Sequence, residues 1–132
     1  LVNDLCRQAL TTKQMVLRSS GLQRRNFIPL SDACRAIAHV LQLSGNGELK
    51  DIYNVGGLWS PTIIEMAQLI QKRCSALLDF QPKLMRNMQH ADVASVEFKY
   101  CIDALLKTGF HPIDNKVEEI DELLKFCKDL FL

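Results

Sequence analysis

Apolar residues recur every three or four positions in several stretches of the chain, which is the spacing of a helix with one buried face. We therefore predict helices over residues 1–12, 32–41, 61–77 and 114–131, and a cap followed by a terminating glycine predicts a short helix over 103–107. Their predicted buried faces are as follows: Leu1, Leu5 and Ala9; Ala33, Ala36, Ile37, Val40 and Leu41; Ile63, Met66, Ala67, Ile70, Cys74 and Leu77; and Val117, Ile120, Leu123, Leu124, Cys127 and Phe131.

Capping residues indicate where these helices begin and end. Ser31 and Asp32 are candidate N-caps of the second helix. Ser60 is placed to cap the third helix, with Pro61 at its first position. Asp103 is placed to cap the fourth, and Gly109 ends it.

Short apolar runs between the helices indicate strands. Met15-Val16-Leu17 predicts a short strand, and residues 26–30 are extended, with Pro29 favouring an edge or the end of a strand. Residues 51–55 predict a strand closed by Gly56-Gly57. The region 79–100 has apolar runs at 82–85 and 93–96, which predict one or two short strands around a loop. The result is an α/β chain with a few short strands and about five helices.

Composition narrows the class of protein. The chain has 132 residues, of which 48% are hydrophobic, enough for one core. Its formal net charge of +1 gives no support to nucleic-acid binding, and no apolar run is long enough to span a membrane. The first residues have neither the basic start nor the apolar run of a signal peptide, so we expect a cytoplasmic protein without nucleic-acid or membrane partners.

The five cysteines have wide gaps and no C-x-x-C pair, a pattern that fits neither a disulfide framework nor a zinc site. Cys34, Cys74 and Cys127 fall on the predicted apolar faces of helices. We expect them to be buried, reduced and inert, and we expect no metal site.

Cationic residues are the main candidates for chemistry. The sequence contains no G-x-G-x-x-G, no P-loop and no H-E-x-x-H. Arg24-Arg25, with Arg18 upstream, either binds a phosphate or carboxylate or is a solvated surface pair. Arg86 and His90 join such a site if their loop folds back. Gly56-Gly57 is a turn more often than an anion site, and Trp59 is expected to be a packing residue.

Three segments in order resemble a known family. Residues 23–37, QRRNFIPLSDACRAI, are similar to the pattern R-D-F-(V/I)-x-V-x-D-x-(A/V)-x-A-(I/L); residues 51–57, DIYNVGG, followed by Ser60-Pro61 are similar to x-Y-N-(V/L)-G-x-G-x-x-x-S; and residues 102–112, IDALLKTGFHP, are similar to D-x-x-K-x-x-x-x-L-G-(F/W)-x-P. The family is that of the NAD-dependent epimerases and dehydratases, the extended short-chain dehydrogenases that act on nucleotide-sugars.

The resemblance covers the C-terminal half of the proteins of that family. It implies that residues 1–132 are the C-terminal substrate-binding portion, and that the Rossmann half and the catalytic Tyr-x-x-x-Lys would precede Leu1. The parent enzyme would use NAD or NADP in hydride transfer on a nucleotide-diphosphate sugar. This chain alone would bind no cofactor, would carry no catalytic residue and would be inactive. A naturally shortened, ligand-binding relative is a further possibility.

The resemblance also assigns roles to residues. Arg25 matches the arginine that binds the diphosphate, and the backbone of Met15, Val16 and Leu17 would face the base, with Arg18 near the base or ribose. Asn26 replaces the family's Asp and loses a charge that could orient the guanidinium.

A second phosphate-binding arginine of the family aligns with Gln89, and Arg86 is the nearest substitute. Asp32 is expected to cap a helix.

Two further expectations come from the residues themselves. One is self-association, because the strands of the chain would leave an edge exposed. The other is an alternative function, a small non-catalytic binding module such as a winged-helix regulator that reads DNA with the helix over 61–77. That helix carries Lys72 and Arg73 as its only cations.

Overall fold

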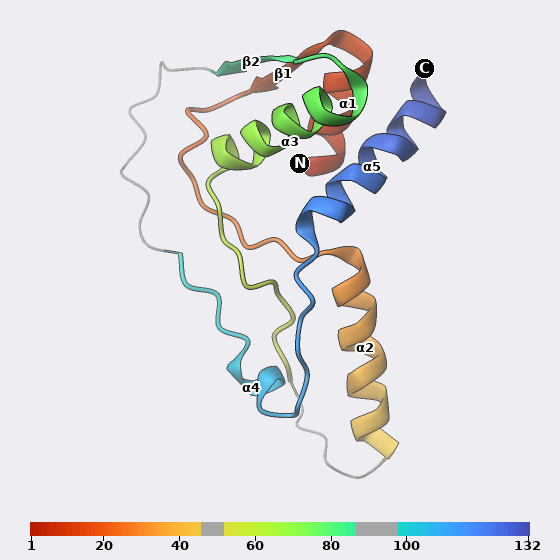
Figure 1. Ribbon diagram of the computed structural model, residues 1–132. Coiled ribbons are helices and arrows are strands. Elements are labelled where there is room, and N and C mark those ends of the chain that lie inside the picture. Colours follow the sequence, from red (N-terminus) through yellow and green to blue (C-terminus); the bar gives the residue numbers. More distant parts are fainter. Residues whose placement is uncertain (46–51, 87–97) are drawn as a thin grey trace.

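The computed structural model describes residues 1–45, 52–86 and 98–132 (Figure 1). Within these ranges the chain is a mixed α/β fold of five helices and two strands, which confirms the fold class predicted from periodicity. The elements are α1 (Val2–Thr12), β1 (Gln14–Leu17), α2 (Leu30–Gly45), α3 (Ile63–Leu78), β2 (Lys83–Arg86), α4 (Asp103–Leu106) and α5 (Lys116–Phe131).

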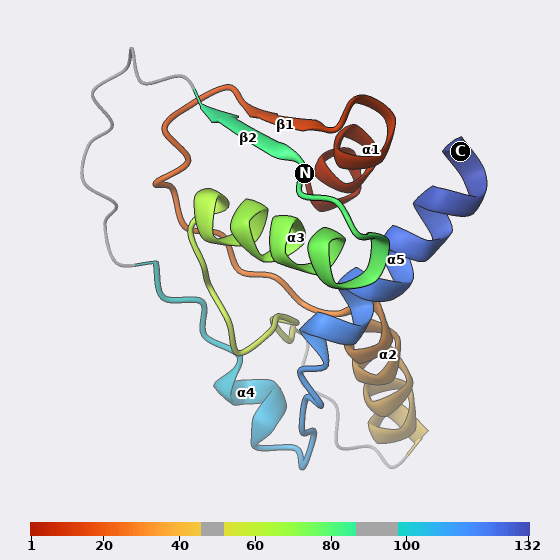
Figure 2. The ribbon, with the colours of Figure 1, turned by 45° about the horizontal axis from the view of Figure 1, so that its top comes forward.

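The two strands form a parallel pair. Gln14 lies opposite Lys83 and Leu17 lies opposite Arg86, and the Lys83 N–H donates to the Lys13 carbonyl at 2.9 Å. Lys13 has a left-handed backbone (φ 56°), which ends α1 and turns the chain into β1. Figure 2 shows the strand pair lying across α3, with α1 beside it. The strands predicted at 15–17 and 82–85 are thus confirmed.

The main core lies where α1, α3 and α5 meet β1. Each helix contributes its apolar face; the buried residues include Leu5, Leu10, Met15, Met66, Ile70, Ile120 and Leu124. Cys6, Cys74 and Cys127 are buried in the same core, as expected for the latter two. Burial raises the pKa of the Cys6 thiol to about 12 and that of Cys74 to about 11, which keeps both protonated and unreactive.

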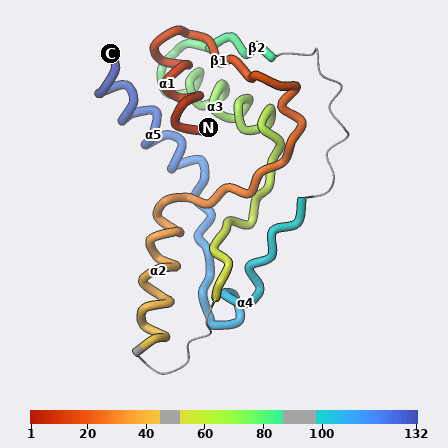
Figure 3. The backbone as a smooth tube through the Cα atoms, turned by 180° about the vertical axis from the view of Figure 1, so that it is seen from behind, coloured from red at the N-terminus to blue at the C-terminus, as the bar shows by residue number. Residues whose placement is uncertain are grey.

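A second, smaller cluster lies at the opposite end of the molecule. Buried Ala36, Leu105 and Phe110 join α2 to α4, with Tyr53 and Val55 packed against them. Two long segments connect this end to the main core and run side by side, as Figure 3 shows from behind. Single antiparallel bridges link them, Arg24 to Thr62 and Phe27 to Trp59.

The start of α2 differs from the prediction. The helix begins at Leu30, so Ser31 and Asp32 lie in its first turn and do not cap it. The Leu30 N–H and the Ser31 hydroxyl both donate to the Glu119 carboxylate of α5, at 2.9 and 3.1 Å. Asp32 instead accepts hydrogen bonds from the backbone of residues 113–114. Tertiary contacts, which local sequence does not reveal, therefore set this helix end.

Two other predicted caps are wrong by one or two residues. The N-cap of α3 is Thr62, not Ser60, because Thr62 and Glu65 form a capping box: the Thr62 hydroxyl accepts from the Glu65 N–H, and the Thr62 N–H donates to the Glu65 carboxylate. The N-cap of α4 is Ile102, and Asp103 is its first helical residue.

Several side chains predicted to be buried are exposed. Ile37 and Leu41 of α2 are 60% and 67% exposed, and Cys34 is exposed on the same helix. The small cluster around Ala36 covers one side of α2, and Leu43 near the end of the helix is also buried, whereas Ile37 and Leu41 face outward. Leu77 and Phe131, near the ends of α3 and α5, extend beyond the main core and are exposed as well.

The strand predicted over 51–55 is wrong for residues 52–55, which the structure describes as irregular. Tyr53 and Val55 pack their side chains into the small cluster, and apolar packing therefore explains the pattern that suggested a strand. The run at 93–96 lies outside the described residues. Within the described ranges, no helix has the length and apolar character needed to cross a membrane.

Candidate functional site

A cavity of about 380 Å³ opens between the start of α1, the end of β1 and the loop that follows it. Four of the residues predicted from the resemblance line it, namely Val16, Leu17, Arg18 and Arg25. The remaining wall is formed by Leu1, Asp4, Leu5, Gln8, Ser19, Gln23 and Ile63. The fold thus brings two arginines and a strand edge to one hollow.

The other predicted residues lie elsewhere. Met15 is fully buried in the core beneath the cavity, because side chains alternate along β1. Arg86 lies opposite Leu17 on β2 and is exposed beside the cavity without lining it. Gln89 and His90 lie outside the described residues. The structure therefore gathers four of the predicted residues and leaves Met15 and Arg86 at the margin.

Arg24 and Arg25 are neighbours in sequence but have different surroundings. The Arg24 guanidinium donates to the Ser60 carbonyl at 2.9 Å and lies 3.8 Å from the Glu65 carboxylate. The Arg25 N–H donates to the Pro61 carbonyl at 3.0 Å, so the backbone is fixed. Since successive side chains of an extended segment point to opposite sides, Arg25 faces the cavity while Arg24 anchors the segment to α3.

The two cavity arginines lack acidic partners in the described part of the chain. Arg18 and Arg25 are both exposed, and neither forms an ion pair there. Asp4 lies in the same wall, but its carboxylate is taken by Arg7 at 2.6 Å and Gln8 at 2.7 Å. These hydrogen bonds lower the pKa of Asp4. The cavity thus offers two guanidinium groups that can bind an anionic ligand with paired hydrogen bonds.

Asn26, which replaces the family's Asp, has a structural role. Its amide donates to the Gly57 carbonyl at 2.8 Å and accepts from the Gly57 N–H at 2.9 Å. A carboxylate could accept that bond but could not donate the other. Gly57 is required here because a Cβ would lie 2.0 Å from the Phe27 carbonyl oxygen. The glycine pair therefore serves close packing of the two connecting segments.

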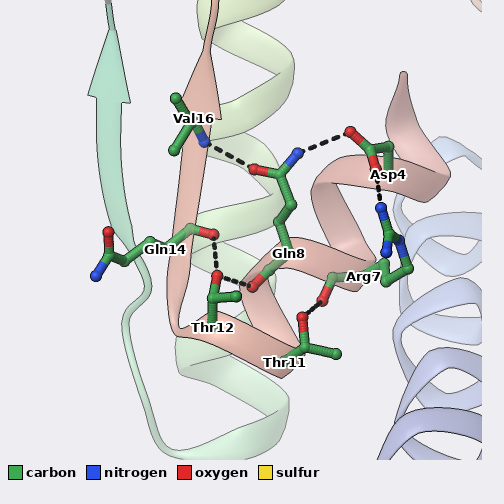
Figure 4. A network of polar contacts seen from close by, with 7 residues as sticks. All are labelled: Asp4, Arg7, Gln8, Thr11, Thr12, Gln14 and Val16. Carbon is green, nitrogen blue, oxygen red and sulfur yellow. Dashed lines mark hydrogen bonds and ion pairs between the residues drawn. The ribbon is translucent and has the colours of Figure 1, made fainter.

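A polar network along α1 was missed by the sequence reasoning. Gln8 accepts a hydrogen bond from the Val16 N–H at 3.0 Å and donates to Asp4 (Figure 4). The i, i+3 and i, i+4 spacing of Asp4, Arg7 and Gln8 was the available signal, since residues so spaced share one face of a helix. Their position at the strand edge depends on tertiary structure.

A larger, mostly apolar hollow of about 690 Å³ lies near Trp59. Trp59 packs against Phe27, with 6.3 Å between ring centroids, and Lys116 lies 5.3 Å from its ring. Trp59 is thus a packing residue, as expected. No group of three or more potential metal ligands occurs within the described ranges.

The helix α3 offers little to nucleic acid. Arg73, one of its two cations, is held by the Asp121 carboxylate of α5 through two hydrogen bonds of 2.7 and 2.8 Å. These bonds raise the pKa of Arg73. The arrangement therefore does not favour the winged-helix alternative.

Comparison with known proteins supports the resemblance. Residues 1–56 match the model of the NAD dependent epimerase/dehydratase family. A dTDP-glucose 4,6-dehydratase of Streptomyces niveus is 30% identical over 120 residues, which cover 89% of this chain and 33% of that protein. A second dTDP-glucose 4,6-dehydratase, from an Actinoplanes strain, is 32% identical over 56 residues, or 17% of its length. The chain thus spans about a third or less of these relatives.

Solved structures share the fold. A dTDP-glucose 4,6-dehydratase from Bacillus anthracis, in complex with NAD, matches with a TM-score of 0.74 and 19% identity, over 98% of this chain and 39% of that one. A UDP-N-acetylglucosamine 4-epimerase from Methanobrevibacter ruminantium, in complex with UDP-N-acetylmuramic acid, matches with a TM-score of 0.73 and 21% identity, over 98% and 39%. The fold matches part of the extended short-chain dehydrogenase fold. The match of residues 1–56 to the family model, together with the two dehydratase relatives, supports placing this chain in the NAD-dependent epimerase/dehydratase family.

Proposed function

We propose that this chain binds the nucleotide diphosphate of a sugar nucleotide, as the substrate-binding portion of an NAD(P)-dependent epimerase or dehydratase. One observation carries the proposal: the cavity at the end of β1 holds two arginines without acidic partners in the described ranges, beside an exposed strand edge. A diphosphate has the charge and the oxygen geometry that guanidinium groups bind. The Val16 carbonyl, on the edge that faces away from β2, offers a backbone acceptor to a base.

Each residue then has a stated task. Arg25, whose backbone is fixed by Pro61, holds the diphosphate, and Arg18 contacts the diphosphate or the ribose. Arg86, on the neighbouring strand opposite Leu17, extends the positive charge along the sheet edge. Gln89 is the remaining candidate for contact with the phosphate.

The cofactor belongs to another part of the protein in this proposal. NAD(P), when bound, supplies hydride removal from the sugar and its return. The sequence contains no G-x-G-x-x-G loop, so this chain contributes binding and orientation of the substrate, and no step on the cofactor. A Rossmann portion is its proposed partner, and the 132-residue chain alone is expected to be inactive.

Calorimetric titration of the 132-residue chain with UDP tests the proposal. Wild type is expected to bind, and Arg25→Ala is expected to raise the dissociation constant roughly thirtyfold, about 2 kcal/mol, because a charged hydrogen bond is lost. Lys72→Ala is the matched control: it removes an exposed positive charge on α3, outside the cavity, and is expected to bind as wild type does.

Two results would contradict the proposal. One is the absence of UDP and dTDP binding to a folded wild-type chain. The other is equal affinity in wild type and Arg25→Ala, which would remove Arg25 from the site. Turnover of a UDP- or dTDP-sugar by the chain with added NAD would refute the separate expectation that it is inactive alone.

A further inference from the structure

The free edge of β1 is closed at one point by a side chain of α1. Strand β1 pairs with β2 through its odd-numbered residues, since the Lys13 carbonyl accepts from Lys83 and parallel ladders use alternate residues. The Val16 N–H therefore points away from β2, and it donates to the Gln8 side chain at 3.0 Å. Both residues line the cavity of the proposed site.

The orientation of the Gln8 amide is fixed by its two partners. A backbone N–H can only donate, so the atom facing Val16 is the oxygen Oε1. The ionised carboxylate of Asp4 can only accept, so the atom facing it, 2.7 Å away, is the nitrogen Nε2. Arg7 holds the other oxygen of Asp4 and keeps that carboxylate in place (Figure 4). Gln8 therefore turns its remaining N–H toward the cavity as a donor, while its oxygen is engaged by the Val16 N–H.

An acceptor lies beside this donor. In a strand, the N–H and the C=O of one residue point to the same side, so the Val16 carbonyl lies on the edge that faces away from β2. Val16 is 49% exposed, and no described residue donates a hydrogen bond to its carbonyl. The second N–H of the Gln8 amide has no acceptor among the described residues. The wall of the cavity thus carries a donor next to an acceptor.

We infer that Gln8 is a specificity-determining residue that selects a base with a carbonyl oxygen next to a ring N–H. This inference rests on the proposed nucleotide-binding function. Uracil, thymine and guanine carry that edge: the carbonyl accepts from Gln8 Nε2 and the ring N–H donates to the Val16 carbonyl. Cytosine and adenine carry an amino group next to a ring nitrogen, so donor meets donor and acceptor meets acceptor.

UDP and CDP form the matched pair of probes, because their bases differ only at this edge: uracil has a carbonyl next to a ring N–H, and cytosine has an amino group next to a ring nitrogen without a hydrogen. Wild type is expected to bind UDP at least about tenfold more tightly than CDP, since the mismatched base leaves polar groups unpaired. Gln8→Glu keeps an acceptor for Val16 but has no N–H to donate. In this variant the ratio of the CDP and UDP dissociation constants is expected to fall to about one or below.

Gln14→Glu is the control, because it adds the same charge at an exposed position of β1 outside the cavity. It is expected to keep the wild-type ratio, which separates base selection from a general repulsion of phosphate.

Equal binding of UDP and CDP by wild type would overturn the inference and leave the proposed function standing, and this measurement requires no variant to fold. An unchanged ratio in folded Gln8→Glu would also overturn it. Failure of wild type to bind any nucleotide would overturn the proposed function, and the inference with it.

Discussion

Replacing Asp32 is expected to loosen the junction between α2 and the segment that leads into α5. The Asp32 side chain is fully buried, and its carboxylate accepts three hydrogen bonds: from the Ile113 N–H at 3.0 Å, from the Asp114 N–H at 2.8 Å and from Arg35 at 2.6 Å. Arg35 is partly exposed and contributes less, so the two backbone bonds dominate.

The magnitude follows from these bonds. A hydrogen bond to a charged group contributes about 1.5–3 kcal/mol, and the lower end applies here because water reaches the partly exposed 113–114 segment. Asp32→Ala removes both backbone bonds and is expected to lower the free energy of unfolding by about 3 kcal/mol. Asp32→Asn keeps one acceptor and is expected to cost about 1–2 kcal/mol.

The effect also depends on pH. Burial alone would raise the pKa of Asp32, but the hydrogen bonds from Ile113, Asp114 and Arg35 outweigh it and hold the pKa below its ordinary value. A carboxyl group whose pKa is lower in the folded state stabilises the protein above its unfolded pKa of about 3.9. That contribution is lost as pH falls through the folded pKa, so Asp32→Asn is expected to lose less stability on acidification than wild type.

Urea unfolding, followed by the fluorescence of the single tryptophan at pH 7 and at about pH 3, measures both effects. Asp129→Asn, at an exposed position near the end of α5, is the control and is expected to match wild type. Substitutions of ordinary surface residues change the free energy of unfolding by less than about 0.5 kcal/mol. A loss that small in Asp32→Ala at pH 7 would refute the role given to Asp32.

Three other substitutions or treatments test the packing. Gly57→Ala would bring a Cβ to 2.0 Å from the Phe27 carbonyl oxygen of the facing segment, so urea titration should show a free energy of unfolding lower by about 1–3 kcal/mol. An unchanged midpoint of urea unfolding would contradict the close approach. Leu124→Ala, in the centre of the core, should lower the free energy of unfolding by about 2–5 kcal/mol, while Leu130→Ala, at a position that is 60% exposed, should lower it by less than about 0.5 kcal/mol. Equal losses in the two variants would contradict the burial of Leu124 in the core. In thiol titration Cys34 and Cys101 should react in the native protein and the three buried cysteines only after unfolding; five fast thiols would show an open core.

The sequence predicted elements better than their ends and surroundings. Periodicity located the four longer helices because an amphipathic stripe reflects burial against any neighbour, and Asp103 with Gly109 located the short α4. It failed where burial depends on which neighbour is present: Ile37 and Leu41 were predicted to share the buried face of Ala36, yet they are exposed, while Leu43 is buried. The strand predicted at 51–55 failed for a similar reason, because Tyr53 and Val55 pack against helices.

For the candidate site, the family resemblance pointed to Arg25 and the β1 edge, and the cavity brings them together. Without the resemblance, residue type and spacing did not distinguish Arg24 from Arg25. That distinction comes from the bridge between Arg24 and Thr62, which fixes the side to which each arginine points. The role of Gln8 depends on α1 lying beside β1, a contact that no local pattern encodes.

Amide chemical-shift mapping of the isotope-labelled chain titrated with UDP locates the bound nucleotide and so tests whether the cavity at the end of β1 is its site. The largest shifts are expected on Val16, Arg18 and Arg25, together with the side-chain amide of Gln8. Residues of the small cluster around α4 should remain unchanged. Saturable shifts centred on the apolar hollow near Trp59, with none at Val16 or Arg25, would contradict this placement of the site.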